Sequence, residues 1–188
     1  RFLLLFILFT LFFFFSAFSY ADTVSTDIAN SVFRLHVIAN SNSEEDQNLK
    51  YKVRDALLEY MNSLCTTISS KEDTINIAQN YIKDFENIAN QVIYDNGYNY
   101  DVTVEISQCD FPTKNYGDVT LPAGMYDALK VKIGSAMGHN WWCVMFPPLC
   151  FVDVSSGIVP ESSKELLQEN MSDEEYDLIT DSYTNSGT

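Results

Sequence analysis

The chain has 188 residues, of which 11 are Lys or Arg and 26 are Asp or Glu, for a formal net charge of −15 at pH 7. A chain of this length forms one domain of ordinary size with its own hydrophobic core. The charge argues against binding to nucleic acid or to anionic lipid headgroups, because both need clustered cations. Eight acidic residues and one lysine fall in residues 161–188, so the acidity is concentrated at the end of the chain.

The N-terminus is an apolar run over residues 2–15, interrupted only by Thr10 and followed by small residues that include Ser19 and Ala21. This layout predicts a secretory signal peptide over residues 1–21, with cleavage after Ala21. The alternative is an uncleaved anchor, because residues 2–18 just reach the length that spans a bilayer. In either case we expect residues 22–188 to lie across a membrane.

The segment from Val32 to Ala39 alternates apolar residues with others, which predicts a half-buried strand with Arg34 and His36 on its polar face. A solvent-facing or hydrogen-bonded role is the simplest interpretation of His36. Ser43 and the acidic residues after it predict the start of a helix that ends near Leu64.

A second helix is predicted to begin at Ser70 and to stop at Asn96-Gly97, where glycine permits a left-handed turn. Beyond it, a period of two predicts strands over residues 98–109 and 126–133, with a short one near Val119. Short turns between them favour antiparallel pairing. We therefore expect an α+β fold: a two-layer sandwich with a mixed, mostly antiparallel sheet and two helices on one face.

This domain is expected to cover residues 22–160. The remaining residues, 161–188, have few apolar side chains and are expected to form an acidic, mobile tail. Two Ser-x-x-Glu patterns, at Ser162 and Ser172, resemble capping boxes and allow short helices there.

Residues 139–150 read "HNWWCVMFPPLC" and contain both tryptophans of the chain. In an extended segment Trp141 and Trp142 point to opposite faces, so both cannot enter one core. One of them would then form an exposed aromatic patch around a Pro-Pro turn, and such patches mark binding surfaces. Core and interface both remain open from the pattern alone. The candidate partner-binding residues are Trp141, Trp142, Phe146, Pro147, Pro148 and Leu149.

Outside the cytoplasm, cysteines are first interpreted as disulfides. Cys143 and Cys150 flank the Pro-Pro turn and form the candidate pair, while Cys65 and Cys109 lie at a predicted helix end and strand end. The alternative function is a secreted enzyme that uses Cys143 as a nucleophile with a histidine as base. The histidine and cysteine spacings do not fit a zinc site, and no hydrolase or phosphate-binding motif occurs. We expect no catalytic activity, cofactor, metal or small-molecule substrate.

Three segments, "FRLHVIANSNSEEDQNLKYKVRDAL" from Phe33, "LPAGMYDALKVKIG" from Leu121 and above all "NWWCVMFPPLCFVD" from Asn140, resemble the stage II sporulation protein R family of endospore-forming bacteria. The likeness covers about residues 30–155. The last motif is long enough to be specific. The acidic tail and the apolar run do not contribute to it.

The resemblance implies an exported signalling protein and not an enzyme. Members are secreted across the forespore membrane into the space between the forespore and mother-cell membranes. There they trigger a membrane-embedded aspartic protease, the stage II sporulation protein GA, which processes the sigma factor E precursor. The family has no assigned catalytic residues, so the resemblance marks Trp141, Trp142, Cys143 and Cys150, with Phe146, Pro147 and Pro148, only as motif positions.

Overall fold

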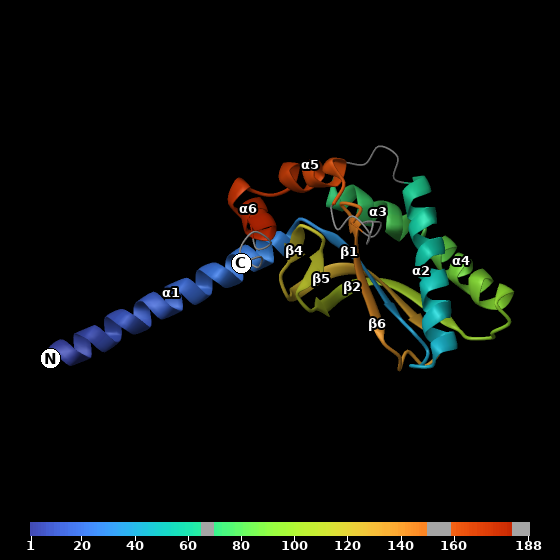
Figure 1. Cartoon of the computed structure of the whole chain (residues 1–188), viewed down its shortest axis with the longest axis horizontal. Helices are drawn as coiled ribbons and strands as arrows, with labels where there is room; N and C mark the ends of the chain where they lie inside the picture. Colours follow the sequence, from blue (N-terminus) through green and yellow to red (C-terminus); the bar gives the residue numbers. More distant parts are fainter. Residues whose placement is uncertain (65–69, 150–158, 182–188) are drawn as a thin grey trace.

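The computed structural model describes residues 1–64, 70–149 and 159–181, and its centre is a four-stranded sheet in the order β2-β5-β1-β6 (Figure 1). The strands are β1 (Phe33–Ile38), β2 (Val102–Phe111), β5 (Gly124–Ile133) and β6 (Asn140–Phe146). The central strands β1 and β5 are parallel, and the two outer pairs, β1–β6 and β2–β5, are antiparallel. The predicted α+β class and the mixed, mostly antiparallel sheet are therefore confirmed.

The helix after β1 is α2 (Glu44–Leu64), and it begins where the hydroxyl of Ser43 accepts a hydrogen bond from the backbone N–H of Asp46 at 3.2 Å. Its first turn carries three acidic residues, which suit the positive end of the helix dipole. The predicted cap at Ser43 is confirmed.

The predicted second helix is divided into α3 (Lys71–Asn80) and α4 (Ile82–Asp95), which meet at Tyr81. Ser70 caps α3 by accepting from the backbone N–H of Asp73, as predicted. Gly97 ends this region with a φ of +82°, a conformation that favours glycine. Start and stop are confirmed, whereas the break between the two helices was not expected.

One face of the sheet packs against α2, α3 and α4. Alternate residues of a strand point to the same face. The side chains that join the helices in one apolar cluster include Leu35 and Val37 of β1, Leu129 and Val131 of β5, and Cys143 and Met145 of β6. The helices contribute Leu49, Val53, Leu57, Phe85 and Ala89, none of which is more than 2 % exposed. This face matches the predicted sandwich.

The opposite face is also buried, so the expectation of a half-buried first strand is wrong. Arg34 is 0 % exposed and His36 is 8 % exposed. A second apolar cluster covers them, built from the end of α1, the hairpin β3 (Lys114–Tyr116) and β4 (Val119–Leu121), and the C-terminal helices. Segments that are distant in sequence converge here, which a strand's own residue pattern does not encode.

The region predicted as a mobile tail contains two helices, α5 (Glu161–Glu169) and α6 (Asp173–Asp181). Leu167 and Ile179 are 0 % and 1 % exposed in the second cluster, so these helices contribute side chains to the core, which their composition did not demand. The mobility of the tail stays a prediction. Ser172 and Glu175 form the predicted capping box, while α5 is capped by neither serine of its first turn. Buried side chains thus join these otherwise polar helices to the domain.

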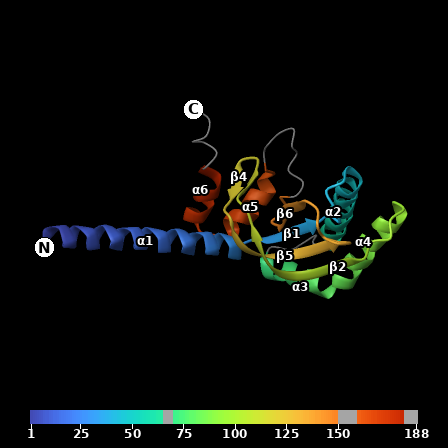
Figure 2. The same ribbon diagram turned by 90° about the horizontal axis from the view of Figure 1, so that it is seen from below.

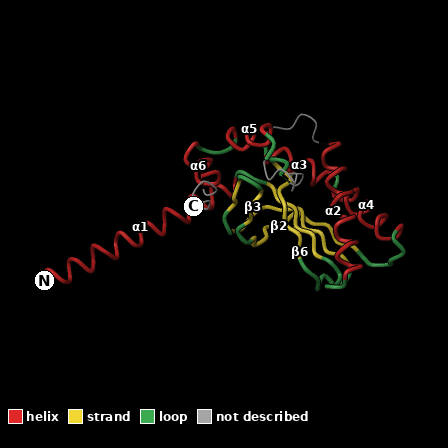
Figure 3. Tube along the Cα trace, viewed as in Figure 1, coloured by secondary structure: helices red, strands yellow, loops and turns green. Residues whose placement is uncertain are grey.

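The first helix, α1 (Phe2–Asn30), extends away from the domain (Figure 2). This helix contains a stretch that is long and apolar enough to cross a membrane, which is compatible with a signal peptide or an anchor. The helix continues past the predicted cleavage position, and its last turns bring Ile28 and Ala29 into the second cluster. Figure 3 shows α1, α5 and α6 gathered near one end of the strands, with α2 and α4 near the other.

Candidate functional site

The segment expected to form an aromatic loop is mostly strand β6, which lies at one edge of the sheet. Its register places Trp142 opposite His36 and Trp141 opposite Val37 of β1. Asn140 and His139 at its start are exposed, whereas residues 143–146 are buried. The strand therefore runs from the surface at the tryptophans into the core.

The two tryptophans point to opposite faces of the sheet, as predicted. Trp141 packs at the edge of the helix-covered cluster and Trp142 at the edge of the second cluster, and both are half-buried. Neither indole N–H finds a hydrogen-bond partner within the described part of the chain. Each ring thus divides its surface between the core and the outside of the molecule.

A basic side chain lies over each tryptophan. The guanidinium of Arg54 on α2 is 4.3 Å from the ring centre of Trp141, and the ammonium of Lys114 on β3 is 4.7 Å from that of Trp142. The rings of Tyr51 and Trp141 also lie nearly perpendicular to each other, with centroids 5.4 Å apart. Such cation–π contacts hold each ring in place and put positive charge beside it in a strongly acidic protein.

Arg34 is the largest fully buried side chain, and no carboxylate pairs with it among the described residues. Its guanidinium lies 4.1 Å from the ring centre of Phe111 and 4.6 Å from that of Tyr126, and it donates to the hydroxyl of Tyr116 at 2.5 Å. One of its nitrogens, Nη1, has no partner in this part of the chain. Aromatic faces stand in for the usual counter-ion.

His36 lies beside this cluster and its ring stacks on Trp142, with centroids 5.9 Å apart. Its Nε2 is 2.9 Å from Oδ1 of Asn140, while Nδ1 has no partner in the described residues. Burial lowers the pKa of His36 below its ordinary value, because the charged ring would lose its hydration. Because its pKa is lowered, the ring of His36 is neutral near pH 7. Burial likewise raises the pKa of Tyr126 to about 12.

The residues of the Pro-Pro turn are placed differently from the expected exposed patch. Phe146 and Leu149 are 3 % and 1 % exposed, and Pro147 is buried, so these three do not form a surface. Pro148 is exposed. The backbone N–H of Leu149 donates to the carbonyl of Val144, which folds the turn back onto the strand. The expected patch is thereby reduced to Trp141, Trp142 and Pro148.

The buried Cys143 is disulfide-bonded. Cys65 and Cys150 lie outside the described residues, so the pairing of Cys143 with Cys150 stays a prediction. A bonded sulfur has no thiolate with which to attack a substrate. Cys109 is a free, buried cysteine. Within the described ranges, no group of three or more His, Cys, Asp or Glu side chains could hold a metal ion.

Sequence reasoning missed the aromatic rings that surround Arg34, which are Phe111, Tyr116 and Tyr126. The sequence did contain a signal for them, namely large apolar rings in segments that were expected to be turns or strand ends. The structure places them on the supposedly polar face of β1.

The structure is a single α+β domain that follows one long N-terminal helix with an apolar run. An edge strand of its sheet contains both tryptophans. The chain belongs to the stage II sporulation protein R family, because the sequence model of that family matches residues 29–156. It has a role in sporulation. Stage II sporulation protein R of Bacillus subtilis (strain 168) is 34 % identical over 157 residues, which cover 84 % of this chain and 69 % of that protein. No solved structure matches the chain.

Proposed function

We propose that this protein is an exported signal that activates a membrane-embedded aspartic protease, the stage II sporulation protein GA, which then processes the sigma factor E precursor in the mother cell. Family membership is the observation that carries the proposal. The apolar helix α1 supports it, because it suits passage of the domain across the forespore membrane into the intermembrane space.

The protein acts as an agonist. It binds the extracytoplasmic part of the protease and prefers the active arrangement over the inactive one. Only a difference in affinity between the two arrangements can shift their populations. A preference of about 10⁴-fold would convert a mostly inactive protease into a mostly active one.

Trp141 and Trp142, on opposite faces of the edge strand β6, and the exposed Pro148, six residues beyond Trp142, are the contact residues of this proposal. The partly exposed rings offer apolar area without loss of freedom, since Arg54 and Lys114 already hold them. The two cations add positive charge at the rim. A partner surface with acidic side chains would complement them.

The test is to co-express the full chain, the protease and a tagged sigma precursor in a host that does not sporulate. The wild-type chain is expected to cause removal of the pro-sequence. Trp142→Ala is expected to reduce processing by about tenfold or more, as for an interface hot spot. Tyr94→Ala on α4, at a side chain that is 75 % exposed, is the matched control and should process normally.

Point variants are needed because β6 lies in the sheet, so deleting residues 139–150 would remove an edge strand. Trp142→Phe keeps a ring against His36 and separates loss of contact from loss of folding. Normal processing by a folded Trp142→Ala protein would contradict the contact surface. No processing with the wild-type chain would contradict the function itself.

The disulfide between Cys143 and Cys150 is part of the same proposal. In the chain-entropy description, closing so short a loop stabilises by only about 2–3 kcal/mol. Cys143→Ser and Cys150→Ser are expected to have equal effects on processing, because each breaks the same bond. A much larger loss from Cys143→Ser alone would favour the alternative role as a nucleophile.

A further inference from the structure

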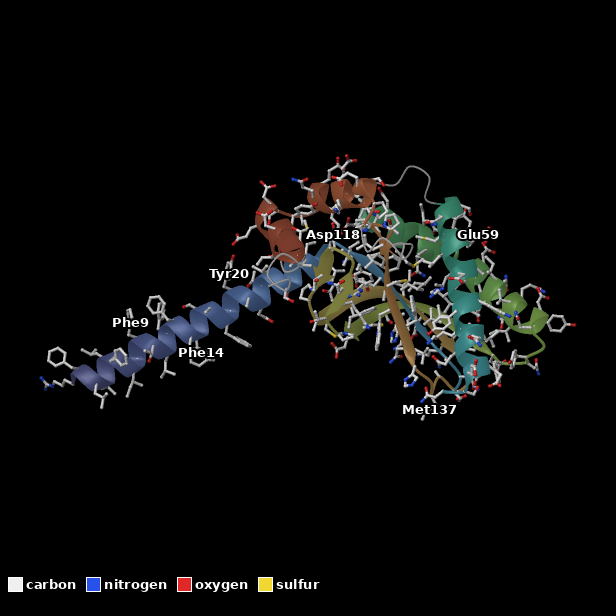
Figure 4. The ribbon with its side chains drawn as sticks, viewed as in Figure 1. Phe9, Phe14, Tyr20, Glu59, Asp118 and Met137 are labelled. Atoms are coloured by element: carbon white, nitrogen blue, oxygen red, sulfur yellow. The ribbon has the colours of Figure 1, made fainter. Side chains whose placement is uncertain are left out.

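The cover of the second face leaves part of the sheet accessible. The β3–β4 hairpin, in which Figure 4 labels Asp118, lies toward one end of the strands, and the turn that contains Met137 lies at the other end. Toward that turn, two rows of side chains cross all four strands on the second face. The first row is Glu105, Lys130, His36 and Trp142, and the second is Thr103, Lys132, Ile38 and Asn140.

These two rows, with Lys114 of β3 beside them, form a lysine surface. Only His36 among the eight side chains of the rows is buried. Adjacent strands lie about 4.8 Å apart and alternate residues of a strand about 7 Å apart, so the rows span about 15 Å by 7 Å. The lysine surface is therefore large enough to receive a short segment of another protein.

The lysine surface is positively charged. Lys132 donates a hydrogen bond to the carboxylate of Glu105 at 2.8 Å, and the two charges form an ion pair. Neither Lys130 nor Lys114 forms an ion pair among the residues that the structure describes. Three lysines against one glutamate leave two positive charges in excess, in a chain whose net charge is −15.

The two sides of the β6 edge differ in what lies next to the tryptophan. On the side of Trp141, the sheet is covered by helices, and Tyr51 and Arg54 of α2 lie against the ring. On the other side, Trp142 stacks on His36 and continues the first row across the lysine surface. A partner segment that contacts Trp142 can therefore extend over the sheet, whereas one that contacts Trp141 meets α2.

We propose that the lysine surface docks an acidic segment of the partner protease. An apolar side chain of that segment would pack against Trp142 and Ile38, while its carboxylates would pair with Lys130 and Lys114. Charge complementarity supports this occupant, because the lysine surface is cationic in an otherwise acidic protein. The inference rests on the proposed function and deepens it, since it selects the Trp142 side of β6 and gives the chemistry of the segment that binds there.

Other occupants fit the lysine surface less well. Two excess charges attract anionic lipid headgroups only weakly, and the chain as a whole is strongly acidic. A second copy of this chain would bring a further net charge of −15 toward the first, and this repulsion opposes association. A local acidic segment with an apolar side chain matches both the lysines and the ring of Trp142.

The first test varies the charge at position 130 in the full chain and measures processing of the sigma precursor. Lys130→Glu is expected to reduce processing by about tenfold, as expected when a contact worth about 1.4 kcal/mol is lost. Lys130→Gln should reduce processing less, because it removes the charge without reversing it. Lys130→Arg keeps the charge and should process as the wild type does.

The matched control is Lys83→Glu on α4, which makes the same change of charge at a side chain that is 81 % exposed. It should process normally. Equal processing by the Lys130→Glu and Lys83→Glu chains, at any level, would overturn the proposal. Because Lys130 is partly exposed, Lys130→Gln should leave the unfolding temperature close to that of the wild type, so a loss of processing is separable from a loss of folding.

The second test identifies the occupant directly. Thr103, which is exposed beside Lys132, is replaced by p-benzoylphenylalanine in the full chain, and cells that contain the protease are irradiated. A covalent product with the protease is expected, and mass spectrometry should find Asp or Glu residues in the attached segment. The same replacement at Glu59, which is exposed on α2 (Figure 4), should give no such product.

A product whose attached segment lacks acidic residues, a product only with lipid or with a second copy of the chain, or no product at all would overturn the docking proposal. The failure of the proposed function is a different result. If the wild-type chain does not trigger processing, the proposed function is wrong. If the wild-type chain triggers processing and Lys130→Glu does so equally well, only the assignment of the lysine surface is wrong.

Discussion

On the face covered by α2, α3 and α4, the sheet packs aliphatic side chains from regular helices, whereas on the opposite face it packs an arginine among aromatic rings. The first face uses a continuous stretch of chain for its cover. The second is covered by the end of α1, a small hairpin and two short C-terminal helices. The periodic pattern of apolar residues in the sequence therefore predicts the cover of the first face but not the cover of the second.

The two faces of the sheet also differ in whether they bury a charged side chain. A buried cation without an anionic partner is costly, because it loses hydration without a full replacement. Arg34 is held by rings and a tyrosine hydroxyl, so the second face depends on a few specific contacts. The helix-covered face depends on the sum of many apolar contacts. The predictions below test this contrast, from the largest expected effect to the smallest.

The helix-covered face should be the most sensitive to loss of volume. Phe85→Ala removes a ring that is 0 % exposed and packs against Tyr60, and it is expected to lower the free energy of unfolding by about 3–5 kcal/mol. Urea unfolding measures the change. Tyr94→Ala on the exposed side of the same helix is the control, with an expected change of about 0.5 kcal/mol or less.

The cover of the second face should contribute to stability despite its acidity. Leu167→Ala on α5 is expected to cost about 2–5 kcal/mol, because Leu167 is fully buried. Leu178→Ala on α6 should cost far less, since that leucine is half-exposed. Equally small losses in urea unfolding would show that residues 161–181 do not form part of the core, as the composition alone predicts.

The arginine cluster should respond to loss of a single oxygen. Tyr116→Phe removes the hydroxyl that accepts from Arg34, which leaves a buried donor unsatisfied. The expected loss is about 1–3 kcal/mol in the free energy of unfolding, measured against Tyr94→Phe as control. No loss would mean that the aromatic faces alone stabilise the guanidinium, and the contrast between the two faces would weaken.

The second face should also carry a pH dependence. The folded pKa of His36 is lowered from 6.5 mainly by burial, so the unfolded chain binds the proton more readily. Its contribution to stability is complete above about pH 6.5 and is lost as the pH falls toward the folded value. Thermal unfolding from pH 7.5 down to pH 5.5 should show a smaller decrease for His36→Gln than for the wild type. Equal decreases would contradict this role of His36.

Much of the fold is predictable because it depends on local patterns. The caps at Ser43 and Ser70, the glycine stop at Gly97 and the strand period of β5 are each encoded within a few residues. The opposite orientations of Trp141 and Trp142 follow from strand geometry in the same way.

The rest of the candidate site was not predictable for a physical reason. Phe146 and Leu149 are apolar residues beside prolines, and their pattern is the same whether they face a core or a partner. Burial of Arg34 depends on Phe111 and Tyr126, which lie more than 70 residues away in the chain. A pocket beside α1 is lined by Tyr20 and Val24 of that helix and by Leu178 of α6, from the opposite end of the chain.

By itself, the sequence determined the apolar N-terminal helix, the α+β class, the starts of α2, α3 and α6 and the family, because these depend on neighbouring residues or on a long, specific motif. Only the tertiary structure decided that β6 is an edge strand, that both faces of the sheet are covered and that the acidic C-terminal region contributes to the core. Burial is a property of the surroundings of a side chain, and those surroundings come from distant segments.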